Sequence, residues 1–64
     1  MKISKAKFNL AIARSGKMRE EYRDAISDGT LVNIRRGREI RPSTVGRIAR
    51  ALGCDPADII EEES

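Results

Sequence analysis

Residues 28–38 read DGTLVNIRRGR, a short stretch with a glycine near each end. In a helix, Leu31 and Ile34 share one face because they are three residues apart. That face is too narrow to form a core element by itself. The opposite face carries a valine, an amide and guanidinium groups. A surface that only has to stay soluble does not need this combination. The stretch predicts a short helix, capped by Ser27 or Asp28, whose outer face has a further task.

Two segments before this helix also show helical patterns, and no segment shows the alternation typical of a strand. The first is expected over about residues 5–14, with an apolar face formed by Ala6, Phe8, Leu10, Ala11, Ile12 and Ala13. Gly16 ends it as a left-handed C-terminal glycine. The second is expected over about residues 18–25, with an apolar stripe of Met18, Tyr22, Ala25 and Ile26.

Two further helices are expected after Gly37, which stops the opening helix. The fourth, about residues 43–52, has the clearest apolar repeat at i, i+3, i+4 and i+7, formed by Val45, Ile48, Ala49 and Leu52. Gly53 ends it. The fifth begins with Asp55 as its cap and Pro56 at its first helical position. The sequence therefore predicts an all-α fold of five helices.

At 64 residues, the chain is expected to be one small domain, residues 1–64, with an acidic tail over about residues 61–64. A chain of this length buries only ~60% of its unfolded surface. Cys54 is the one cysteine, so it is expected in the core and not in a disulfide. The chain has no histidine and no apolar run of membrane length, and we expect no metal-ligand cluster and no signal peptide. We expect a soluble, cytoplasmic and complete protein with no metal and no cofactor.

The net charge of +3 is unevenly distributed along the chain. Residues 1–50 hold all 13 lysines and arginines against five acidic residues, a net charge of +8, whereas residues 51–64 carry −5. The segment 35–50 alone has six arginines and one acidic residue. Such a division favours a polyanion as the partner of one face.

Two short helices joined by a tight turn, the second with Asn and Arg outward, suit a helix-turn-helix that reads the DNA major groove. Arg pairs bidentately with guanine and Asn with adenine. On a period of 3.6, Leu31 and Ile34 hold the helix on the domain while the opposite face points away. Gly29 would let the helix approach the duplex closely, and Val32 could contact a thymine methyl group.

The stretch GTLVNIRRGREIRPSTVGRIARALGCDPADII resembles the second half of a lambda-repressor-like (Cro/Xre-type) helix-turn-helix domain, particularly that of very short bacterial regulators. The resemblance covers about residues 8–60. Its most diagnostic parts are TLxxIxxG at residues 30–37, RPSTVGRIARALG at residues 41–53 and the final DPADII. It implies a compact five-helix domain that binds double-stranded DNA through the third helix.

The resemblance also implies the residues that contact DNA. Base contacts are expected at Ser27, Asp28, Gly29, Val32, Asn33 and Arg36. Phosphate contacts are expected at Lys17, Arg19, Arg38, Arg41, Ser43 and Thr44, and Arg35 is a further candidate from its own position and charge. The start of the fourth helix also suits a phosphate because its free amides and dipole attract anions. Asp28 has two possible roles, as a cap or as an acceptor from cytosine.

Two features depart from the family pattern. The segment YRDAISDG lacks the usual turn glycine and is one or two residues shorter, which could alter the angle at which the third helix meets DNA. Arg35 stands where many members have an acidic residue paired with a base. It could contact a phosphate or pair with Glu39 or Glu21.

The chain offers no catalytic constellation and no evident small-molecule pocket, so we expect no enzymatic activity. The expected function is sequence-specific regulation of transcription, most simply repression. A protein-binding module, such as an antitoxin or an assembly factor, and an architectural or excisionase-like DNA binder are the alternatives. A homodimer is expected because one small domain reads few base pairs. Its interface would use Ile59 and Ile60, one of which could instead be covered by the first helix.

Overall fold

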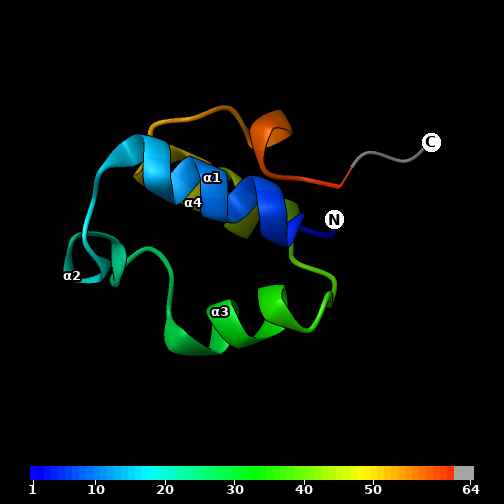
Figure 1. The fold of residues 1–64 in the computed structure, drawn as a ribbon. Coiled ribbons are helices and arrows are strands. Elements are labelled where there is room, and N and C mark those ends of the chain that lie inside the picture. Colours follow the sequence, from blue (N-terminus) through cyan, green and yellow to red (C-terminus); the bar gives the residue numbers. More distant parts are fainter. Residues whose placement is uncertain (62–64) are drawn as a thin grey trace.

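The computed structural model describes residues 1–61 of the chain, and these residues form an all-α fold. The elements are α1 (Lys5–Ser15), α2 (Arg19–Tyr22), α3 (Asp28–Arg35), α4 (Pro42–Leu52) and a 3-10 turn, η1 (Pro56–Asp58). In Figure 1, α1 and α4 pack together, η1 lies against them, and α3 lies on the opposite side of this pair from η1. The predicted all-α class is confirmed. No helix in the described part is both long and apolar enough to cross a bilayer.

The ends of α1 and α4 follow the signals in the sequence. Ser4 caps α1 because its Oγ accepts a hydrogen bond from the Lys7 amide at 3.3 Å. Gly16 and Gly53 end α1 and α4 with φ of +66° and +68°, a left-handed conformation that only glycine adopts without strain. Pro42 occupies the first turn of α4, where no internal amide hydrogen bond is lost.

The second helix is shorter than predicted. Only Arg19–Tyr22 is helical, and the amides of Ala25 and Ile26 both donate to the Tyr22 carbonyl as the chain turns. Met18 is the extended N-cap and not a helical residue, so the i, i+4 spacing does not place it beside Tyr22. Met18 is 68% exposed. Tyr22 and Ile26 are buried as expected.

The fifth helix is replaced by the single turn η1. Asp55 caps it through Oδ1, which accepts from the Ala57 amide at 2.8 Å. The chain then leaves helical geometry because it pairs with the N-terminal segment. The Ser4 amide donates to the Ile59 carbonyl, and the Glu61 amide donates to the Lys2 carbonyl. Of the acidic tail expected over residues 61–64, only Glu61 lies within the described part.

The core lies between α1, α4 and the segments that flank them. The fully or nearly fully buried apolar residues are Ile3, Phe8, Ala11, Tyr22, Ile26, Ile34, Ile40, Val45, Ile48, Ala49, Leu52 and Ile59. Leu10 was expected on the apolar face of the first helix but is half-exposed. Cys54 is half-buried and packs against the core. Ile59 is fully buried within one chain, so the prediction that it forms a dimer surface is wrong.

Candidate nucleic-acid interface

The start of α3 is fixed by a cap that the sequence left open between two residues. Ser27 is the N-cap, and its Oγ accepts from the Thr30 amide at 3.2 Å. Asp28 is the first helical residue, where its negative charge is favourable beside the free amides. Ile34 is buried and Leu31 is half-buried against the core, so α3 is anchored by the face that the sequence predicted.

The opposite face of α3 is open to solvent. Gly29, Val32 and Arg36 are exposed, and Asn33 is half-buried at one edge of the face. A Cβ atom built at Gly29 would have the Ser27 Oγ as its nearest neighbour at 4.0 Å, so the domain itself does not require a glycine there. The face is therefore free to approach a large partner.

The two cations at the start of α2 already have partners within the chain. The Lys17 ammonium donates to the Ala51 carbonyl at 2.6 Å, in the last turn of α4, where the helix dipole favours a cation. Arg19 pairs with Asp28, with 2.8 Å between Nη2 and Oδ1. Both residues were predicted as phosphate contacts, and in the structure both hold neighbouring helices.

The end of α3 and the segment that follows it carry exposed cations. Arg35, Arg38 and Arg41 are exposed and form no ion pair within the described residues. Arg41 is the N-cap of α4, and it supplies no side-chain hydrogen bond to the first turn of that helix. Exposed Ser43 and half-buried Thr44 lie in this first turn. Amides without a side-chain acceptor, next to arginines, suit an anion.

The sequence offered Glu39 and Glu21 as partners for Arg35, and both carboxylates bind elsewhere. Glu39 Oε2 accepts from the Met1 amino group at 2.7 Å, and this positive charge holds the pKa of Glu39 below its ordinary value. Glu21 Oε2 accepts from the Met18 amide at 2.6 Å. Arg35 therefore pairs with neither of these two carboxylates.

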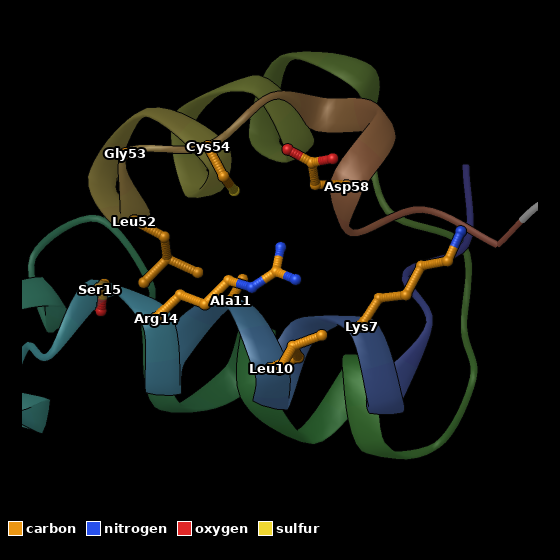
Figure 2. A pocket seen from close by; sticks show the side chains of 9 residues that line it. All are labelled: Lys7, Leu10, Ala11, Arg14, Ser15, Leu52, Gly53, Cys54 and Asp58. Atoms are coloured by element: carbon orange, nitrogen blue, oxygen red, sulfur yellow. The ribbon is translucent and has the colours of Figure 1, made fainter.

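A pocket of about 240 Å³ lies between α1 and the segment that follows α4 (Figure 2). Arg14 extends across it from α1 towards Asp58. Burial raises the pKa of the Cys54 thiol, and the charges of Asp58 and Asp55 raise it further. The thiol is therefore protonated at neutral pH and is a poor nucleophile. No group of three or more potential metal ligands occurs within the described residues.

The fold and the exposed basic face define a helix-turn-helix protein. A family model described as a Cro/C1-type HTH DNA-binding domain matches residues 23–63, close to two thirds of the chain. The chain belongs to this family, as the resemblance predicted. DNA binding, a role in regulation and double-stranded DNA as the partner follow at the level of the family, whose members are generally not enzymes. No curated protein and no solved structure matches the chain significantly.

Proposed function

We propose that the chain is a small transcriptional repressor that reads a specific duplex sequence with α3 in the major groove. The observation that carries this proposal is the two-sided character of α3. Its inner face is anchored by Ile34, whereas Gly29, Val32 and Arg36 are exposed without any task inside the domain. A helix anchored by one face can present the side chains of its other face to base edges.

Affinity would come mainly from phosphates. Arg35, Arg38 and Arg41 are exposed, and the free amides at the start of α4 follow directly in the chain. Cations that neutralise phosphates release condensed counterions, so binding falls steeply as salt rises. Base contacts by Asn33 and Arg36 would add discrimination of ~1–3 kcal/mol for each good bidentate pair.

A homodimer on an inverted repeat completes the proposal. One eight-residue helix reads only a few base pairs, and a second copy would place another α3 one helical turn away, ~34 Å along the duplex. The interface would leave Ile59 in the core, because that side chain is fully buried in each chain. Ile60, which is half-buried, remains available at the edge.

The test is enrichment of bound duplexes from a randomised DNA pool at near-physiological salt. A two-fold-symmetric motif is expected, with half-sites one helical turn apart. Binding without enrichment, lost uniformly as salt rises, would contradict sequence-specific reading and leave only electrostatic attraction. Sedimentation of the free and the DNA-bound protein gives the number of copies independently of the motif.

A further inference from the structure

Arg19 and Asp28 form an ion pair that joins the two helices of the helix-turn-helix. Arg19 is the first residue of α2 and Asp28 the first residue of α3. The Arg19 guanidinium also lies over the ring of Tyr22, with its carbon 5.2 Å from the ring centroid. An aromatic face and a carboxylate therefore hold one planar group in a defined orientation.

The surroundings of Arg19 argue against a contact with the DNA backbone. Its side chain is only 24% exposed, and Nη2 is already used by Asp28. Nη1 is buried and has no hydrogen-bond acceptor in the described part of the chain. A phosphate needs donors that point into solvent, as those of Arg38 and Arg41 can. Arg19 is arranged to hold Asp28.

Asp28 has the opposite character. Its side chain is 89% exposed, and only Oδ1 has a partner among the described residues. Oδ2 is left as an open acceptor beside the exposed face that contains Gly29 and Val32. A carboxylate next to DNA is normally repelled by phosphates. Here the positive charge of Arg19, whose Nη2 lies 2.8 Å from Oδ1 of Asp28, offsets this repulsion.

The chemistry of base edges then selects the partner of Oδ2. An ionised carboxylate can only accept hydrogen bonds. The major groove presents two amino donors, cytosine N4 and adenine N6. The adenine donor lies between two acceptors, N7 and the O4 of the paired thymine, whereas the cytosine donor has an acceptor, guanine O6, on one side only. A carboxylate therefore meets less repulsion at cytosine.

We propose that Asp28 is a specificity-determining residue that accepts a hydrogen bond from cytosine N4, and that Arg19 is the positioning residue that orients its carboxylate. This inference rests on the proposed reading of the major groove by α3. Stability alone does not account for the pair. Exposed ion pairs contribute little to folding, and the buried Nη1 without an acceptor is unfavourable.

The experiment compares motifs enriched from a randomised duplex pool by the wild-type chain and by three variants. Asp28→Asn keeps the shape but turns an acceptor into an amide, which pairs with adenine N6 and N7. Arg19→Met keeps an apolar stem over Tyr22 and removes the guanidinium. Glu20→Gln is the control, because Glu20 is exposed on α2 and its change removes the same charge as Asp28→Asn.

The wild-type motif is expected to contain one cytosine in each half-site that depends on Asp28. Asp28→Asn should change the preference at that position to adenine. Arg19→Met should reduce the discrimination for cytosine there by about 10-fold, with the rest of the motif and the melting temperature retained. Glu20→Gln should leave the motif unchanged.

Other outcomes overturn the inference in distinguishable ways. An unchanged motif in both Asp28→Asn and Arg19→Met would show that the pair has only a structural role. Uniformly weaker binding by Arg19→Met, with a flatter salt dependence and the same motif, would restore Arg19 as a phosphate contact. Absence of any motif with the wild-type chain would instead refute the proposed function on which the inference depends.

Discussion

At the scale of single residues, two glycines of similar appearance in the sequence have different roles. Gly53 ends α4 with φ of +68°, and a left-handed residue with a side chain costs roughly 1–2 kcal/mol. Gly46 lies inside α4, and a Cβ there would have no atom within 4 Å. Gly53→Ala should lower the free energy of unfolding by about 1 kcal/mol, and Gly46→Ala should raise it by about 0.5–1 kcal/mol. Urea unfolding followed by circular dichroism measures both changes.

The same two substitutions serve as controls for one another, because each adds one methyl group to α4 or to its end. The contradictory result is a less stable Gly46→Ala variant, which would mean that the space beside Gly46 is not open. If Gly46→Ala is more stable yet forms fewer dimers, the glycine contacts a partner subunit.

Cys54 provides a pH prediction at the same scale. Burial and the nearby Asp58 and Asp55 raise the pKa of its thiol above the ordinary value. The folded chain therefore keeps this proton to higher pH than the unfolded chain. The thiol's contribution to stability is complete below its ordinary pKa and is lost as pH rises towards the raised one. Alkylation by iodoacetamide should begin at a higher pH in the folded protein than in urea, and equal pH profiles would contradict this.

At the scale of elements, the bounds of a helix were predicted best where residues at both of its ends signal the start and the stop. The α4 helix has a complete apolar repeat between Pro42 and Gly53, and its observed bounds agree with the prediction within one residue at each end. The expected helix over residues 18–25 failed because Met18 is an extended cap and the chain turns after Tyr22. Local spacing cannot show where a turn interrupts a periodic pattern.

Alanine substitutions in the two parts of the proposed interface, α3 and the segment after it, should change DNA binding in different ways. Asn33→Ala should relax base preference at one position with little change in the salt dependence of binding. Arg38→Ala should weaken binding to all duplexes and reduce the slope of log K against log salt by about 1. Titration of a specific and a scrambled duplex at several salt concentrations separates these effects.

The control for that comparison is Arg47→Ala, because Arg47 is an exposed arginine of α4 that lies outside the predicted contacts. It should leave both the motif and the salt slope close to wild type. A sequence-selective loss in Arg38→Ala would contradict its proposed phosphate role. A uniform loss in Asn33→Ala would remove Asn33 from the residues that read bases.

At the scale of the whole molecule, the contacts that close the fold join distant parts of the chain. Residues 1–4 run between the loop after α3 and the segment after η1, with bridges from Lys2 to Glu39 and from Ile3 to Ile60. Nothing in the periodicity of these residues predicts such pairing. The sequence also did not predict the ion pair in the candidate site. Arg19 and Asp28 were predicted separately as DNA contacts, and their pairing depends on the angle between two helices.

The N-terminal segment should therefore control the stability of the entire domain. Ile3 is 1% exposed, and the backbone beside it bonds to the segments on both sides. Ile3→Ala should cost about 2–5 kcal/mol, a large share of the ~5–15 kcal/mol that stabilises a typical domain. Urea unfolding should shift to a much lower midpoint, and DNA binding should fall with the folded fraction. Exposed Lys2→Ala is the matched neighbour and should change stability little. If Ile3→Ala leaves the midpoint unchanged, residues 1–4 are not part of the cooperative fold, and α1 with α4 must hold α3 in place by themselves.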